Sequence, residues 1–141
     1  YNQRLEEGAR AAEEVGPLRL RPGVGAITDP VARRRARHVV TEITRVRAFA
    51  DALLVGDAQA AGELMLESHE SMRADFEVST PRLDAMVRDL AATPGIYGAR
   101  LTGAGFGGSV VALAAHGAGL PAGAIRVRAS AGARVTSEDG D

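Results

Sequence analysis

Apolar residues recur at spacings of three and four along the first two thirds of the chain, a pattern typical of amphipathic helices. Helix-forming and charged residues fill positions 3–15, and Gly16 and Pro17 end this first expected helix. Positions 16–28 hold three glycines and two prolines, which predicts a loop.

A second helix is expected to begin at Asp29 and Pro30, where a capping side chain precedes proline at the first helical position. Gly56 is expected to end it. The apolar positions of this helix form one stripe that we expect to be buried: Val39, Ile43, Val46, Ala50 and Leu53.

Two further helices are predicted, separated by residues 76–79, which break the helical period and predict a short extended link. Asp57 is expected to cap the first and Thr80, followed by Pro81, the second. The buried face of the first is expected to comprise Ala61, Leu64, Met65, Ser68 and Met72. That of the second is expected to comprise Leu83, Met86, Val87, Leu90 and Ala91.

The pattern then changes to short strand-like segments at 96–101, 109–113 and 125–129, the last alternating apolar and basic residues. Helices followed by a small sheet indicate an α+β fold, with several helices packed on a small antiparallel sheet. The polar and acidic residues 136–141 are expected to form a frayed tail.

Composition excludes several classes of function. The chain carries 17 basic and 18 acidic residues, whereas a general nucleic-acid binder needs a basic excess. No membrane span or signal peptide is visible, and the absence of cysteine excludes disulfides and thiolate metal sites, so a cytoplasmic location is expected. The basic residues are all arginine, which excludes lysine-dependent chemistry.

A glycine-rich loop between the first two expected strands is the main candidate site. It comprises Gly103, Ala104, Gly105, Phe106, Gly107 and Gly108. Glycine permits positive φ and lets a backbone or a phosphate approach closely. The spacing matches a dinucleotide fingerprint, but a strand rather than a helix follows, and a phosphate loop of the Walker type lacks its lysine. A tightly packed hairpin is the alternative.

Other polar clusters are less specific. The basic run 33–38 is a phosphate or nucleic-acid patch or, as the balanced charge favours, a solvated helix face paired with acids. Ser68 and His69 are adjacent on a helix and so cannot form a nucleophile–base pair, which favours a surface or interface histidine. Histidine spacing predicts no metal site. Asp75, Glu77 and Asp84 are candidate acids without an identified base.

Several segments together resemble the galactokinases, of the superfamily of galacto-, homoserine, mevalonate and phosphomevalonate (GHMP) kinases. Residues 68–84 (SHESMRADFEVSTPRLD) resemble their SHxSLRxDFEVSxPELD segment, and residues 98–109 (GARLTGAGFGGS) resemble GARMTGGGFGGC. Residues 33–42 are similar to their RARHVVTE stretch. Residues 1–4 fit the YNxRxxEC element, with Gly8 where cysteine is usual.

The resemblance implies a two-domain kinase that holds ATP and galactose between its domains and transfers the ATP γ-phosphate to O1 of galactose. It implies that residues 29–135 are the carboxy-terminal domain, ferredoxin-like in arrangement, and that 1–28 come from the inter-domain and sugar-site region. Tyr1 is then the residue that contacts galactose, and the glycine loop lies near the phosphate-transfer site. The catalytic residues, phosphate loop and magnesium ligands are expected in an amino-terminal domain, so this chain alone is expected to be inactive.

Three alternatives remain at this point. The first is a non-catalytic galactose- or ATP-binding sensor or regulator on the same scaffold, and the second is a related GHMP sugar kinase. The third is an unrelated α+β interaction domain with a tight glycine hairpin.

The sequence departs from the family at one point. The family usually has a helix between its last two strands, whereas residues 116–124 are too few for a helical crossover.

Overall fold

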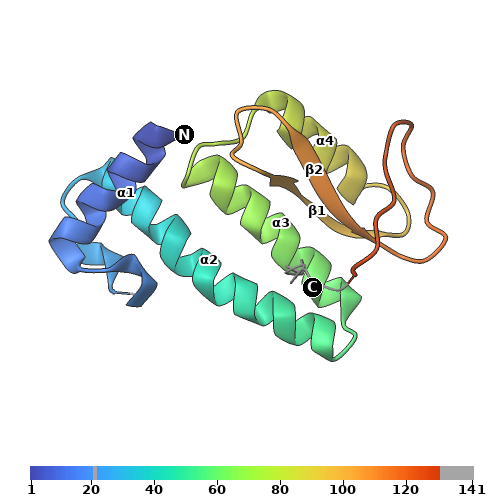
Figure 1. The fold of residues 1–141 in the computed structure, drawn as a ribbon, viewed down its shortest axis with the longest axis horizontal. Coiled ribbons are helices and arrows are strands. Elements are labelled where there is room, and N and C mark those ends of the chain that lie inside the picture. The colour runs from blue at the N-terminus through green and yellow to red at the C-terminus, as the bar shows by residue number, and fades with distance from the viewer. Residues whose placement is uncertain (21, 131–141) are drawn as a thin grey trace, which may run out of the picture.

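The computed structural model describes residues 1–20 and 22–130, and within them it confirms the α+β fold (Figure 1). The four predicted helices are present as α1 (Asn2–Val15), α2 (Pro30–Leu54), α3 (Ala58–Ala74) and α4 (Pro81–Ala91). Two strands follow, β1 (Ile96–Thr102) and β2 (Ser109–Ala114). The expected loop at 16–28 includes two short 3-10 turns, η1 (Leu18–Leu20) and η2 (Val24–Ala26).

The predicted helix starts are confirmed by their capping hydrogen bonds. The carboxylate of Asp29 accepts from the Val31 N–H at 2.8 Å, and that of Asp57 accepts from the Ala60 N–H at 2.9 Å. Each of these bonds satisfies an amide that has no partner within the helix, which fixes the point where the helix begins.

The helices form a layer against one face of the sheet, with α3 lying between α2 and β1 (Figure 1). Met72 of α3, Leu83 of α4 and Leu101 of β1 meet in one buried apolar cluster, which we call the sheet core. Helix α3 touches the backbone of β1 directly: a Cβ added to Gly62 would lie 2.1 Å from the Tyr97 carbonyl oxygen, and one added to Gly98 would lie 2.0 Å from that of Gly62. No residue larger than glycine fits at this contact.

Helix α1 packs on the amino-terminal half of α2 through a second, separate apolar cluster of Ala11, Leu18, Ile27, Ala32 and Ala36. The other half of α2 lies beyond the reach of α1 (Figure 1). The prediction of a buried stripe on α2 was wrong there, since Val46 is 58% and Leu53 47% exposed.

The stripe lies on the wrong side because the inner face of α2 is polar. At the interface with α3, Ser68 donates to Glu42 at 2.6 Å, and the ring Nδ1 of His38 lies 2.9 Å from the Ser71 hydroxyl. The inner positions sit one residue before the apolar ones, about 100° around the helix. A pattern that tracks only apolar residues therefore selects the neighbouring face.

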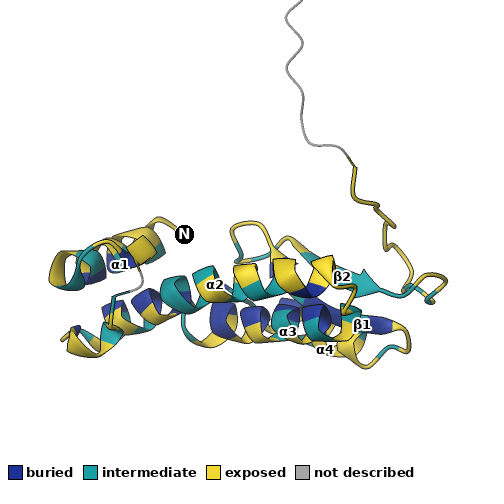
Figure 2. Ribbon diagram, turned by 90° about the horizontal axis from the view of Figure 1, so that it is seen from below, coloured by how far each residue is buried: buried dark blue, intermediate teal, exposed yellow. Residues whose placement is uncertain are grey.

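β1 and β2 form an antiparallel hairpin in which Thr102 pairs with Ser109 and Ile96 with Ala114. The predicted strand at 125–129 is wrong: within the described residues the sheet has two strands, and Ile125 and Val127 are 86% and 77% exposed. Arg126 donates to the Ala118 carbonyl at 3.1 Å, so the segment folds back on the turn before it instead of pairing with β2. Figure 2 shows this segment exposed along its length. The tail expected at 136–141 lies outside the described residues.

Candidate functional site

The glycine-rich loop, residues 103–108, spans the end of the hairpin between Thr102 and Ser109. Its glycines serve two different purposes. Gly105 has φ of 80°, and a Cβ there would lie 2.3 Å from the Val78 carbonyl oxygen, so this position requires close approach. A Cβ on Gly107, at φ of 143°, would meet nothing within 4 Å, so this part of the loop faces open space.

The loop is attached at its centre to the link between α3 and α4, residues 75–80. The Phe106 N–H donates to the Val78 carbonyl at 2.7 Å. Phe106 itself has a left-handed φ of 59° and a side chain that is 52% exposed. Holding a non-glycine residue at positive φ costs on the order of 1 kcal/mol, which the contact with Val78 must offset.

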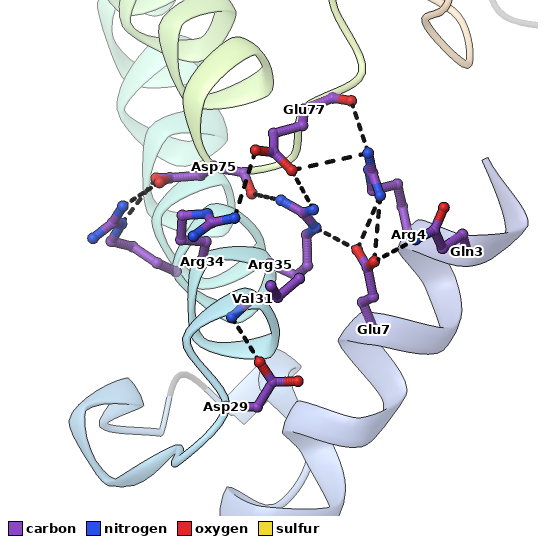
Figure 3. Close-up of polar contacts among 10 residues, drawn as sticks. Gln3, Arg4, Glu7, Asp29, Val31, Arg34, Arg35, Asp75 and Glu77 are labelled. Carbon is purple, nitrogen blue, oxygen red and sulfur yellow. Dashed lines mark hydrogen bonds and ion pairs between the residues drawn. The ribbon is translucent and has the colours of Figure 1, made fainter.

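The link carries one polar and one apolar residue in succession. Val78 is buried in the sheet core, next to Met72 and Leu101. Glu77 has a left-handed φ of 54°, so the prediction of an extended link was wrong at this residue. This backbone conformation directs the Glu77 carboxylate away from the sheet core and toward α2, where it pairs with Arg34 and Arg35 (Figure 3).

Arg35 of α2 lies at the centre of these contacts and is only 1% exposed (Figure 3). Its Nε donates to Glu7 Oε2 of α1 at 2.6 Å, its Nη1 to the Asp75 carbonyl at 2.6 Å, and its Nη2 to Glu77 Oε2 at 2.5 Å. The basic run was expected to lie on a solvated face paired with acids. The pairing is correct, but the solvated position is wrong for Arg35, because it shares the buried face of Ala32 and Ala36.

The charges around Arg35 hold its carboxylate partners ionised. The hydrogen bond from Arg35 lowers the pKa of Glu77, with Arg34 and Arg4 adding to the effect. Burial by itself raises the pKa of Glu7, but the hydrogen bond and charge of Arg35 outweigh it and leave that pKa below its ordinary value. Arg37 pairs with the Asp75 carboxylate on the exposed side of the same cluster.

Tyr1 precedes the first turn of α1 and is 53% exposed. Its carbonyl accepts from the Arg4 N–H at 2.8 Å, and the Arg4 guanidinium reaches the Glu77 carbonyl at 3.4 Å. Tyr1 is thus one helical turn from a contact with Glu77, and the glycine loop contacts the next residue, Val78. The structure brings the amino-terminal end of α1 and the glycine loop to the same link (Figure 1).

Of the two positions expected for His69, surface or interface, the structure shows an interface, that of α3 with β1. The Leu101 N–H donates to His69 Nδ1 at 3.3 Å, so the proton on Nε2 points to Asp84 Oδ1 at 3.2 Å. Burial lowers the pKa of His69. Ser79 also donates to Asp84 Oδ1, at 2.5 Å, so the carboxylate separates serine from imidazole and no activated nucleophile results.

As predicted, Ser68 and His69 diverge, since Ser68 reaches Glu42 of α2 instead.

Over residues 1–20 and 22–130, no three potential ligands among histidine and carboxylate side chains come together as a metal site would need. Within the same ranges no helix has both the length and the apolar character to cross a bilayer.

The chain matches a known protein family. The family model described as "GHMP kinases C terminal" matches residues 49–126, more than half of the chain and the part that contains the link, the glycine loop and both strands. The chain belongs to the GHMP kinases, as their carboxy-terminal domain.

This GHMP kinase domain is similar to proteins named galactokinase. It is 48% identical to the Mycobacterium tuberculosis (strain H37Rv) galactokinase over 120 residues, and 58% identical to the human galactokinase over 80 residues. These matches cover 80% and 57% of this chain but 33% and 20% of the relatives. A crystal structure of Lactococcus lactis galactokinase complexed with galactose superposes with a TM-score of 0.72 at 33% identity, covering 82% of this chain and 33% of the other. The chain spans about a third or less of the length of these relatives.

The buried network around Arg35 was not predicted from the sequence. One signal for it was available: Arg35 and Ala36 lie three and four residues after Ala32, and Val39 lies four and three residues after them, so these four residues share one helix face. A buried arginine on an otherwise apolar face requires an acidic partner, and Glu77 was already a candidate acid without an assigned role.

Proposed function

We propose that this chain is the carboxy-terminal part of a galactokinase, which transfers the γ-phosphate of ATP to O1 of D-galactose and yields galactose 1-phosphate. The observation that carries the proposal is the match to proteins named galactokinase over 80% of the chain. Similarity to a structure with bound galactose supports the choice of sugar. Because the chain covers a third of those proteins, the activity is proposed for the complete protein.

In this proposal the glycine loop closes one side of the phosphate-transfer site. The open space at Gly103 and Gly107 leaves room for a phosphate to approach the backbone, which is how glycine-rich loops hold anions. Attachment of Phe106 to Val78 fixes the centre of the loop while Gly103 and Gly108 remain exposed. The loop residues Gly103–Gly108 thus contribute position and backbone donors, which are the main requirements of phosphoryl transfer.

Magnesium–ATP would supply the transferred phosphoryl group and neutralise its charge. The described part of the chain has no cluster of carboxylates suited to magnesium, so the metal ligands belong in the proposal to the amino-terminal domain, along with the catalytic base. Tyr1, half-exposed beside the link, is proposed to hydrogen-bond the sugar through its phenol. The complete enzyme is proposed to work in the cytoplasm.

The test is ATP- and galactose-dependent release of ADP by the complete protein. We expect turnover by the complete protein and none by the isolated 141 residues. Galactose binding without ADP release would instead support a sensor, and phosphorylation of another sugar in preference to galactose would support a related sugar kinase. Turnover by the 141 residues alone would contradict the two-domain assignment.

Tyr1→Phe in the complete protein tests the sugar contact. Loss of one hydrogen bond to an uncharged group should raise the galactose KM by roughly tenfold, with the ATP KM nearly unchanged. Equal changes in both KM values would remove Tyr1 from the sugar site.

A further inference from the structure

Arg35 of α2 bonds to two other segments, α1 and the link, with three different nitrogens. Nε bonds to Glu7 of α1, and in the link Nη1 bonds to the Asp75 carbonyl and Nη2 to the Glu77 carboxylate. The planar guanidinium fixes the directions of these bonds relative to one another, which a lysine ammonium cannot do. Figure 3 shows the acceptors arranged around this one side chain.

Two short branches leave Arg35. The α1 branch runs through Glu7, which accepts from Gln3 at 3.0 Å and from Arg4 at 3.2 Å, to the helix turn that begins at Tyr1. The loop branch runs through Glu77 to the carbonyl of Val78 and from there to Phe106 of the glycine loop. In the α1 branch Glu7 is buried and Arg4 is partly buried, whereas Glu77 and Phe106 of the loop branch are exposed.

Stability alone does not account for this arrangement. A buried ion pair has to overcome the cost of removing its charges from water, and apolar residues of similar size often stabilise a fold equally well. The network also maintains Glu77 at a positive φ, which is itself unfavourable. What the cluster supplies is a fixed orientation between α1 and the link.

We propose that Arg35 is a positioning residue that couples the Tyr1 end of α1 to the glycine loop, so that the sugar side and the phosphate side of the site hold one relative geometry. This inference rests on the proposed function, because it assigns those two ends to galactose and ATP. Glu7 and Glu77 transmit the coupling, one to each side.

The test uses four substitutions in the complete protein: Arg35→Lys, Glu7→Gln, Glu77→Gln and, as the matched control, Arg73→Lys. Arg73 also forms a two-point pair, with Glu70 on α3, but both side chains are about half exposed. Arg35→Lys should raise the galactose KM and the ATP KM by roughly three- to thirtyfold each. Glu7→Gln should raise mainly the galactose KM and Glu77→Gln mainly the ATP KM. The control should leave both within twofold.

Amide hydrogen exchange gives a readout that does not depend on activity. In Arg35→Lys, exchange should quicken by roughly tenfold in residues 2–7, 76–79 and 103–108 while the α3–β1 contact stays protected. If Arg35→Lys does not fold, Glu7→Gln and Glu77→Gln still test whether one branch affects mainly the galactose KM and the other mainly the ATP KM. Uniform loss of folded protein with unchanged KM values, or changes no larger than in the control, would overturn the coupling. An unmutated complete protein without galactokinase activity would overturn the proposed function, whereas the exchange pattern would still decide the coupling.

Discussion

The two regions that meet at the link hold together in opposite ways. The sheet core is apolar and tightly packed, with Leu101 fully buried among Met72, Val78 and Leu83. The region around Arg35 buries charge instead, and its contacts are directional hydrogen bonds. Adjacent residues, Glu77 and Val78, belong to one region each. The sheet core therefore supplies stability, while the Arg35 cluster supplies orientation.

The largest effect is expected at the glycine contact beside the sheet core. Gly98→Val would drive a side chain into the backbone of Gly62, which cannot move without displacing α3 from β1. We expect a loss of about 4 kcal/mol or more, enough to prevent folding. Expression in soluble form and urea unfolding measure it. A variant that folds with nearly full stability would show that α3 is not fixed on the sheet as described.

A smaller loss is expected from Leu101→Ala, which leaves a cavity in the sheet core. Truncating a fully buried leucine should lower the free energy of unfolding by about 2–5 kcal/mol. Below the unfolding transition, KM values of the complete protein should change less than in Arg35→Lys, because the directional contacts remain. Comparable KM changes in the two variants would erase the distinction between the regions.

The free energy of unfolding should depend on pH in two separate ranges, because histidines and carboxylates titrate at different pH. Burial lowers the pKa of His38 and of His69, so both imidazoles stay neutral to a lower pH in the folded protein than in the unfolded chain. Between those lowered values and about 6.5, the unfolded chain binds more protons than the folded one, and stability falls as the pH falls. The loss is at most about 1.4 kcal/mol per pH unit for each histidine.

The stabilisation by the carboxylates of the Arg35 cluster persists to lower pH than the contribution of the histidines changes. The pKa values of Glu77 and Glu7 lie below their ordinary value, so their stabilisation is lost below about 4.5. Urea unfolding between pH 7.5 and 4.5 should therefore report the histidines, and His69→Gln should flatten the slope. His116→Gln is the control, because His116 is exposed. An equal change in slope for both variants would contradict the burial of His69.

The smallest effect is a gain in the helix that carries Glu7. Gly8 lies within α1, and a Cβ there would meet nothing within 4 Å. Gly8→Ala should raise the free energy of unfolding by about 0.5–1 kcal/mol, because alanine loses less backbone entropy in a helix. A loss instead would mean that another part of the protein occupies this space.

The sequence predicts the elements well and their faces less well. Caps at Asp29, Asp57 and Thr80 are local signals, so the helix starts follow directly from them. The outward turn of Val46 and Leu53 was not predictable from periodicity, because the inner face of α2 uses His38 and Glu42. A strand needs a partner as well as an alternating pattern, which is why 125–129 failed as a prediction.

The candidate site divides in the same way. The glycine loop is a local feature and its location between two strands was predicted correctly. The Arg35 cluster joins residues 7, 35 and 77, and no local pattern gives contacts over such separations. The roles of Tyr1 and of residues 103–108 toward ligands, and the boundaries assigned at 28 and 135, stay predictions.

The alternation of Glu77 and Val78 also limits how the gene for this protein can change in length. Inserting one codon before Glu77 would move its carboxylate to the place of Val78 in the sheet core, and deleting one there would move Val78 among the arginines and Ser79 into the sheet core. Two buried regions would fail from a single event. Between β2 and residue 130, by contrast, turns at Gly117 and Gly123 and a largely exposed chain offer little that an added or lost residue would disturb. Length variation among natural homologues should therefore concentrate after β2 and be absent between α3 and α4.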